Sequence, residues 1–314
     1  ILQLVSQSIA VCRNELVVNA SIGIASSENG YKDAVSIIDD ADLAMYRAKS
    51  LGRSMYEICN SVMHQKAIDR INLESELRKA LDLQHFVMHY QPIIDLNSGT
   101  VVGIEGMVRW ENPERGVLTP SQFIDVAERS GLIVPLGWWV LESACRQVGS
   151  WRRDIPKAEN IFLSVNVSPK IVMEDGLAGR LEEILAGAGL PPSALVLEIP
   201  ETVVLDHGDR AGGQLEILRT SGIRLAIDDF GLEHGSVSQL DRKIFDTLKL
   251  DPTITNRVEG VASGDRLPSS LMGVAAELGI RVIAEGVETG EQLEALCRMG
   301  CEMAQGFWFS SAAK

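Results

Sequence analysis

The stretch IRLAIDDFGLEHGSVSQL, residues 223–240, runs apolar and then places Asp228 and Asp229 side by side before a glycine. Adjacent carboxylates repel each other, so a folded chain keeps them close when water, a partner or a cation separates their charges. Taken alone, such a pair is more often a solvated turn than a metal site. Whether the aspartate pair is a turn or a metal site therefore depends on the side chains that the rest of the chain places beside it.

Similar apolar runs recur along the chain, and helical patterns separate most of them. The strand-like runs are residues 86–94, 101–110, 161–168, 194–201, 223–230, 246–251, 280–287 and 301–309. The helical patterns include residues 119–131, 176–189, 208–222 and 290–300. Eight strands alternating with helices over about 240 residues predict an α/β fold, the (β/α)8 TIM-like barrel, which typically takes about 250 residues. A doubly wound sheet is the structural alternative, although the chain contains no GxGxxG turn.

The chain before these runs has a different pattern. A strand-like run covers residues 15–26, and an amphipathic helix is predicted over residues 33–52, with Asp33 as its N-terminal cap and Gly52 at its end. Apolar side chains recur there at three- and four-residue steps, at Ile38, Ala41, Met45 and Ala48. Two elements cannot make a domain. We therefore expect residues 1–62 to be the remnant of a larger domain, residues 63–83 to form a connecting helix and residues 84–314 to form the barrel.

Charge limits the class of partner. The formal net charge is -14, whereas affinity for DNA or RNA comes largely from lysine and arginine that neutralise phosphates. The composition therefore opposes general binding of nucleic acid polymers. A small anionic ligand stays possible if bound cations reverse the local field.

The cysteine, histidine and hydropathy patterns indicate the cellular location, the type of metal ligand and whether the chain contacts a membrane. The 5 cysteines are scattered, which predicts a reducing, cytoplasmic location. The 5 histidines form no HxH or HExxH arrangement, which argues against a histidine-ligated metal. The apolar stretch GLIVPLGWWVLESAC, residues 131–145, is interrupted well before the roughly 18 residues needed to span a bilayer, so no membrane contact is expected.

Polar side chains stand at or near the ends of most predicted strands. They are Glu105, Asn166, Glu198, Asp228 with Asp229, Lys249, Glu285 with Glu288, and Gln305. Each one alone could cap a helix or face water. In a barrel, however, the strand ends meet at one face, where residues far apart in sequence converge on a pocket. The repetition on strand after strand therefore predicts a functional site.

The residue types indicate the chemistry of this site. Carboxylates and an amide oxygen are hard ligands that suit Mg²⁺ or Mn²⁺. With this many of them, two ions could be held as in phosphodiester cleavage. Lys249 would then orient or deprotonate water, or balance the carboxylate charge. A glycosidase pair and an enolase-like site remain open, although an aromatic content of 5% favours phosphate over sugar.

Seven ordered motifs resemble those of the EAL-domain family. They read YQPIIDLNSGTVVGIEGMVRW (90–110), LSVNVSP (163–169), LEIPET (197–202), AIDDFG (226–231), DTLKLD (246–251), VIAEGVET (282–289) and MAQGFWF (303–309). The resemblance covers about residues 70–314 and implies a (β/α)8-like barrel whose first strand runs antiparallel. Family members are cyclic-di-GMP phosphodiesterases. The resemblance therefore implies metal-dependent hydrolysis of cyclic-di-GMP to linear pGpG in bacterial signalling, and by analogy a homodimer.

A second resemblance concerns the N-terminal residues. SIGIASS, residues 21–27, and ADLAMYRAKSLGR, residues 41–53, resemble the C-terminal end of a GGDEF, diguanylate-cyclase-type domain. The GGDEF motif itself is absent from the sequence. We therefore do not expect this chain to make cyclic-di-GMP.

The first resemblance also implies roles for individual residues. Two Mg²⁺ or Mn²⁺ ions would be held by Glu105, Asn166, Glu198, Asp228, Asp229 and Glu285. Catalysis would depend on Glu105, Asp228, Lys249 and Glu285, and either Lys249 or Glu285 would deprotonate the attacking water. The substrate and its water shell would contact Gln91, Met107, Arg109 and Gln305. Glu201 would anchor the loop after the aspartate pair, and Glu288 would support Glu285.

The chain departs from the family pattern in two places. The motif Glu-Ala-Leu reads Glu105-Gly106-Met107, which keeps the acidic ligand and a side chain of similar volume. Gly106 adds backbone freedom that could cost on the order of 0.5–1 kcal/mol.

The second departure is the loop after the aspartates, which reads DFGLEHGSV over residues 229–237 where active members usually read DFGTGYSSL. Glu233 replaces a glycine there, with Leu232 and His234 on either side. This loop, residues 232–237, motivates an alternative function, a receptor that binds cyclic-di-GMP without cutting it.

Overall fold

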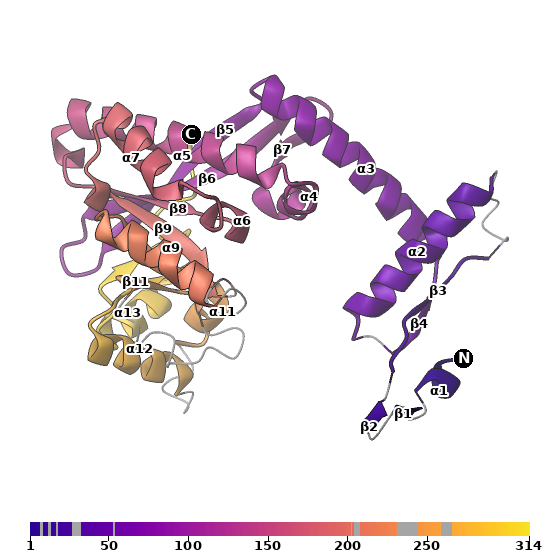
Figure 1. Ribbon diagram of the computed structural model, residues 1–314. Helices are drawn as coiled ribbons and strands as arrows, with labels where there is room; N and C mark the ends of the chain where they lie inside the picture. The colour runs from indigo at the N-terminus through magenta and orange to yellow at the C-terminus, as the bar shows by residue number, and fades with distance from the viewer. Residues whose placement is uncertain are drawn as a thin grey trace. The chain divides into compact units, whose positions relative to one another are not determined.

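A computed structural model describes residues 1–6, 9–11, 14–16, 18–26, 33–52, 54–201, 203, 208–230, 244–258 and 266–314. The chain divides into two compact units, Ile1–Glu76 and Leu77–Lys314 (Figure 1). The helix α3, Ser61–Asp82, contains the boundary between them and corresponds to the connecting helix predicted for residues 63–83.

The first unit is built from short strands and one long helix. Its elements before α3 are α1 (Leu2–Val5), β1 (Ile9–Val11), β2 (Asn14–Leu16), β3 (Ile22–Ile24), α2 (Ala34–Ser50) and β4 (Tyr56–Ile58). The strands β1 and β2 pair antiparallel, whereas β3 and β4 pair parallel. Helix α2 lies so close to β3 that a Cβ atom on Gly23 would stand 1.8 Å from the Ala41 carbonyl oxygen. Glycine at this position therefore permits the contact.

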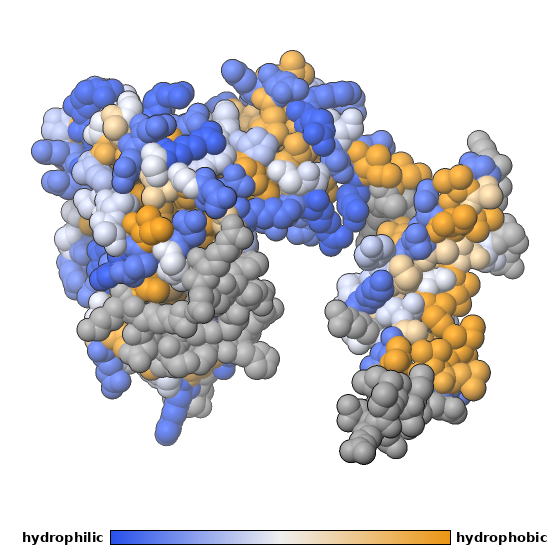
Figure 2. All heavy atoms as spheres, in the orientation of Figure 1, coloured by the Kyte–Doolittle hydropathy of each residue, from blue (hydrophilic) through white to orange (hydrophobic). Residues whose placement is uncertain are grey.

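The predicted helix is confirmed, but its predicted buried face is partly wrong. Asp33 caps α2 through its Oδ1 atom, which accepts the Ser36 N–H at 2.8 Å. Ile38 is 60% exposed, however, and Asp40 is buried in its place. The strand-like run at residues 15–26 divides between β2 and β3. Figure 2 shows hydrophobic side chains gathered over this unit.

The second unit contains a closed barrel. Its strands are β5 (Phe86–Asp95), β6 (Val101–Asn112), β8 (Phe162–Asn166), β9 (Leu195–Pro200), β10 (Arg224–Phe230), β11 (Thr247–Leu250), β12 (Arg281–Ala284) and β13 (Met303–Ala304). Strand β5 pairs antiparallel with both β6 and β13 and so closes the ring, and the other neighbours in the ring pair parallel. The (β/α)8 barrel with an antiparallel first strand is therefore confirmed, and the doubly wound alternative is wrong. A short strand, β7 (Gly116–Leu118), extends the sheet beyond β6.

Helices surround the barrel (Figure 1). They are α4 (Ile124–Ser130), α5 (Ile133–Asp154), α6 (Pro169–Val172), α7 (Leu177–Ala188), α9 (Gly208–Thr220), α11 (Pro252–Thr255), α12 (Leu267–Leu278) and α13 (Gly290–Arg298), with 3-10 turns η2 (Pro120–Gln122), η3 (Pro156–Ala158) and η4 (Pro192–Ala194). The apolar stretch at residues 131–145 lies mostly in α5. Within the described ranges, no helix has the length and apolar character required to cross a bilayer.

The barrel interior is filled in layers, because strand side chains alternate between its two faces. A buried apolar cluster occupies the middle layer and consists of Ile93, Phe162, Val196, Ala226, Ile283 and Met303. Two residues further along each parallel strand, the same inward face carries Ser164, Glu198, Asp228, Glu285 and Gln305. The fold thus brings the polar strand ends together above an apolar floor.

Candidate active site

Lys249 lies at the centre of the polar layer. Its side chain is 1% exposed and contacts carboxylates from four other strands or strand ends. The Nζ atom lies 2.5 Å from Glu285 Oε1, 2.7 Å from Glu198 Oε1, 3.1 Å from Glu105 Oε2 and 3.8 Å from Asp228 Oδ1. The structure therefore brings together all the residues predicted to be catalytic.

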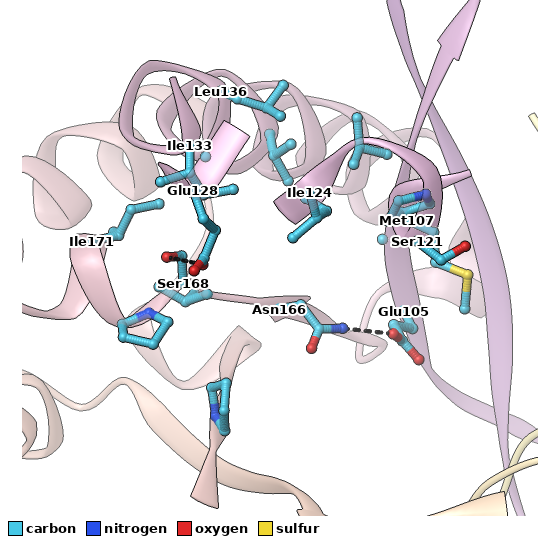
Figure 3. A pocket seen from close by; sticks show the side chains of 18 of the residues that line it. Glu105, Met107, Ser121, Ile124, Glu128, Ile133, Leu136, Asn166, Ser168 and Ile171 are labelled. Carbon is cyan, nitrogen blue, oxygen red and sulfur yellow. Dashed lines mark hydrogen bonds between the residues drawn. The ribbon is translucent and has the colours of Figure 1, made fainter. Parts of the chain in front are cut away.

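Glu105 connects the lysine to two amide side chains. Its Oε1 atom accepts the Asn166 Nδ2–H at 2.9 Å, an interaction drawn in Figure 3. Its Oε2 atom accepts the Gln305 Nε2–H at 2.5 Å, and the same Nε2 group donates to Glu285 Oε1 at 3.1 Å. Asn166 and Gln305 thus lie in one hydrogen-bond network with the carboxylates.

Ser164 is a site residue that the sequence reasoning missed. Its hydroxyl donates to Glu198 Oε1 at 2.5 Å, and both side chains are 0% exposed. The signal was present in the sequence, because Ser164 precedes Asn166 by two residues and therefore shares its face of β8. The hydroxyl fixes the orientation of a carboxylate that has no contact with water.

The electrostatics reflect an excess of negative charge. Burial, followed by repulsion from Glu105, raises the pKa of Glu198 well above its ordinary value. Burial also raises the pKa of Glu285, to about 7, against the attraction of Lys249. Burial alone would lower the pKa of Lys249, but the surrounding carboxylates, Glu105 first, raise it well above its ordinary value. One ammonium group therefore balances several carboxylates incompletely.

The chemistry of the site fits a divalent cation. Among the residues that the structure describes, no three acidic, cysteine or histidine side chains form a metal centre, since the carboxylates gather around Lys249 instead. Three buried oxygens of this network, Glu198 Oε2, Asp228 Oδ1 and Gln305 Oε1, nevertheless lack a hydrogen-bond partner among these residues. Buried carboxylate oxygens without donors are costly, and a hard cation is the group that would satisfy them.

A pocket of about 540 Å³ opens over this network. Gln91 and Arg109 line it, as does Met107, so the residues predicted to contact substrate lie at one opening. Gln91 Nε2 donates to the Ser310 carbonyl at 2.9 Å. The guanidinium Nη1 atom of Arg109 donates to the Val108 carbonyl at 2.9 Å. Burial lowers the pKa of Arg109, and Glu105 opposes that effect.

A second pocket, of about 520 Å³, adjoins the first (Figure 3). The two share lining residues, Glu105, Met107, Arg109 and Asn166. The second pocket is mainly apolar and lies among η2, α4, α5, β6 and β8, with Ile124, Ile133, Leu136 and Ile171 among its lining residues. Glu128 also lines it, and its Oε1 atom accepts the Ser168 hydroxyl at 2.6 Å. The shared residues connect a charged pocket to an apolar one.

Four of the predicted site residues make no contact described above with the network around Lys249. Glu288 is exposed at the pocket wall, where its backbone N–H donates to Gln292 Oε1 at 2.8 Å. Glu201 is buried directly after β9. Asp229 lies in β10, where the pairing with β11 shifts register between Ile227 and Phe230. Glu233 and the rest of the loop at residues 232–237 lie outside the described residues.

Residues 74–312 match the model of the EAL domain, and residues 1–55 match the diguanylate cyclase GGDEF domain. The chain is 36% identical over 303 residues to the bifunctional diguanylate cyclase/cyclic di-GMP phosphodiesterase MucR of Pseudomonas aeruginosa, covering 96% of this chain and 44% of MucR. It is 35% identical over 296 residues to the cyclic di-GMP phosphodiesterase PdeR of Escherichia coli, covering 94% of this chain and 44% of PdeR. The chain thus spans less than half the length of these relatives.

Solved structures agree in fold. The PaMucR phosphodiesterase in complex with c-di-GMP superposes with a TM-score of 0.73 at 35% identity, covering 77% of this chain and 97% of that one. The EAL enzyme Bd1971, bound to cAMP and cyclic-di-GMP, superposes with a TM-score of 0.77 at 26% identity, covering 92% of this chain and 76% of that one.

Proposed function

The chain belongs to the EAL-domain family, and on that premise we propose that its barrel hydrolyses cyclic-di-GMP to linear pGpG with divalent cations. The observation that carries the proposal is the closed ring of Glu105, Glu198, Asp228 and Glu285 around Lys249 at the floor of a pocket. Relatives named as cyclic di-GMP phosphodiesterases support the same reaction.

The cation-holding residues in this proposal are Glu105, Asn166, Glu198, Asp228 and Asp229, with Glu285 beside them. Bound Mg²⁺ or Mn²⁺ would supply Lewis acidity and positive charge at a phosphodiester group. The buried oxygens without hydrogen-bond partners, on Glu198, Asp228 and Gln305, are the first that such cations would satisfy.

Exposure separates the roles of Lys249 and Glu285. The Lys249 side chain is 1% exposed and enclosed by carboxylates, whereas the Glu285 side chain is 14% exposed and lines the pocket. We therefore assign Glu285 as the group that takes the proton from the attacking water. Lys249 holds the carboxylate of Glu285 in place through the contact at 2.5 Å.

The two adjoining pockets fit an extended ligand with both charged and apolar parts. Phosphates would lie over the charged pocket, and a base would enter the apolar pocket beyond Met107 and Arg109. Cyclic-di-GMP, with two phosphates and two bases, matches this division. A homodimer and a cytoplasmic location remain predictions, as do the domain limits 1–62, 63–83 and 84–314.

The test is a turnover assay on the purified protein with cyclic-di-GMP and Mn²⁺ or Mg²⁺. The expected product is pGpG, and Glu105→Ala should lower kcat by at least about a hundredfold, because it removes charge at the reacting centre. Glu111→Ala is the matched control, since Glu111 is on the same strand but pairs with Lys314 at the surface. Product formation by Glu105→Ala at the wild-type rate would refute the proposal.

The receptor alternative is not favoured, because MucR and PdeR, the relatives described above, carry the name cyclic di-GMP phosphodiesterase. The altered loop allows a direct test of it. If the loop limits turnover, the triple variant Leu232→Thr, Glu233→Gly and His234→Tyr will raise kcat with little change in binding measured by calorimetry. Tight binding by the wild type without turnover would instead support the receptor.

A further inference from the structure

Arg224 and Arg281 lie at the end of the barrel interior opposite the active site. Each precedes a residue of the apolar middle layer, Ala226 or Ile283, by two positions. Strand alternation therefore directs both side chains to the same interior face, at the N-terminal ends of β10 and β12. The Arg224 guanidinium carbon stands 4.7 Å from the centre of the Phe162 ring, which belongs to that layer.

Neither arginine forms a salt bridge with a carboxylate of the described residues, although Asp246 lies close enough to attract Arg224. Arg224 Nε is buried there without a hydrogen-bond partner. The carboxylates at this end of the barrel are held by backbone groups. Asp246 Oδ2 accepts the Leu225 N–H at 3.1 Å, and Asp95 Oδ1 accepts the Ser98 N–H at 2.7 Å. Asp246 therefore offsets only part of the positive charge of Arg224 and Arg281, in a chain whose net charge is -14.

The positive charges are close enough to interact. Burial lowers the pKa of Arg224 to about 10, and repulsion from Arg281 is the next cause, opposed by Asp246. Arg152, at the end of α5, adds a weaker repulsion and donates to the Ile161 carbonyl at 2.9 Å. A folded protein tolerates such repulsion poorly unless an anion relieves it.

A hydroxyl completes the group. Thr247 begins β11 between the two arginine-bearing strands, pairs with Arg281 and Ala226, and is 2% exposed. Thr247 is therefore the direct neighbour of Arg281, and Arg224 lies two residues before Ala226, the partner of Thr247 on β10, on the same interior face. Both arginines are half-buried, so part of each side chain reaches solvent.

We propose that the N-terminal mouth of the barrel binds a phosphate group between Arg224 and Arg281. Guanidinium groups bind phosphate oxygens through pairs of parallel N–H donors. The two guanidinium groups, whose charge Asp246 offsets only in part, attract a phosphate anion, and Thr247 beside Arg281 can donate a further hydrogen bond. The apolar layer separates this site from the active site, so the proposal does not depend on the enzymatic function.

The test is ³¹P NMR of inorganic phosphate titrated with the whole chain, in the presence of a chelator and at constant ionic strength. Saturable line broadening is expected for the wild type. Arg281→Gln should weaken binding at least about tenfold, because a charged hydrogen-bond donor is lost. Arg180→Gln is the control, since Arg180 pairs with Glu142 at the surface. Absence of saturable broadening with the wild type would overturn the proposal.

Two further variants make the result specific. Arg281→Lys keeps the charge but loses the paired donors, so it should bind phosphate with an affinity between those of the wild type and Arg281→Gln. Arg109→Gln, in the pocket above the active site, should bind as the wild type does. Equal affinity in all Arg281 variants, or loss of binding in Arg109→Gln, would refute the site. Competition of 5′-GMP with inorganic phosphate would identify a nucleotide phosphate as the ligand. Absence of competition by 5′-GMP would identify the free phosphate ion.

Discussion

Lys249 is a fully buried cation whose neighbours are carboxylates from β6, β9, β10 and the end of β12. Desolvating any one of these charges alone would be expensive, so each depends on the others. Ser164 and Gln305 contribute neutral hydrogen bonds that hold two of the carboxylates in fixed orientations. The lysine therefore has a structural role in addition to any role in turnover.

Replacement of this lysine tests that dependence. In metal-free buffer, Lys249→Met should lower the free energy of unfolding by about 3–5 kcal/mol, because it leaves buried carboxylates without their cation. Urea unfolding measures the change, and Lys157→Met, at an exposed position in η3, is the control. Mn²⁺ should restore more stability to Lys249→Met than to the wild type. Equal stability of Lys249→Met and the wild type would contradict the account.

At the scale of elements, β6 shows how closely two strands pack inside the barrel. A Cβ atom on Gly103 would lie 2.4 Å from the Phe162 ring of the neighbouring strand β8. At Gly106, the departure from the family motif, an added Cβ would meet Met88 Cε at 3.2 Å and Ala144 Cβ at 3.5 Å. Glycine is therefore required at residue 103, whereas an alanine at residue 106 needs a small movement of one flexible side chain.

Alanine at residue 103 should therefore be costly. We expect Gly103→Ala to lower the free energy of unfolding by about 1–3 kcal/mol, because the new methyl group displaces the Phe162 ring. Gly179→Ala on α7 is the matched control, since nothing lies within 4 Å of its added Cβ, and it should be neutral or stabilising by up to about 1 kcal/mol. Thermal or urea unfolding distinguishes the two, and a similar cost for both would disprove the packing argument.

At the scale of the whole molecule, barrel closure decides which groups water can reach. Cys145 and Cys301 are buried on the barrel, whereas Cys297 is exposed on α13. Burial raises the pKa of both buried thiols to about 12. Their reactivity thus reports on opening of the second unit.

Alkylation of the native protein at pH 9 should modify Cys297 and leave Cys145 and Cys301 protected until denaturant is added. Mass spectrometry of the digested protein measures the pattern. The two thiols ionise near pH 8.5 when unfolded and near pH 12 when folded, so their contribution to stability is complete below about pH 8.5. That contribution is lost as the pH rises toward 12. Rapid modification of Cys145 in the native state would contradict the closed barrel.

Hydrophobic periodicity is a local property, and it was sufficient to place all eight barrel strands. The polar residues at the strand ends could also be identified, because an apolar run followed by a polar residue repeats on strand after strand. The predicted helix at residues 33–52 was right for the same reason, whereas its buried face was partly wrong. Whether the helix buries the face of Ile38 or the face of Asp40 depends on the elements that pack against the helix. The hydrophobic pattern of the helix alone does not contain that information.

Contacts across the barrel could be identified only from the tertiary structure. Lys249 and Glu105 are 144 residues apart, and their contact at 3.1 Å exists because ring closure brings β6 and β11 to face each other across the interior. The pairing of β8 with β9 places Ser164 beside Glu198, and strand alternation places Arg224 and Arg281 at the opposite end of the interior. Sequence patterns show which face of a strand a residue occupies. The distance between two such faces depends on strand order and register, and these are set by the packing of the whole ring.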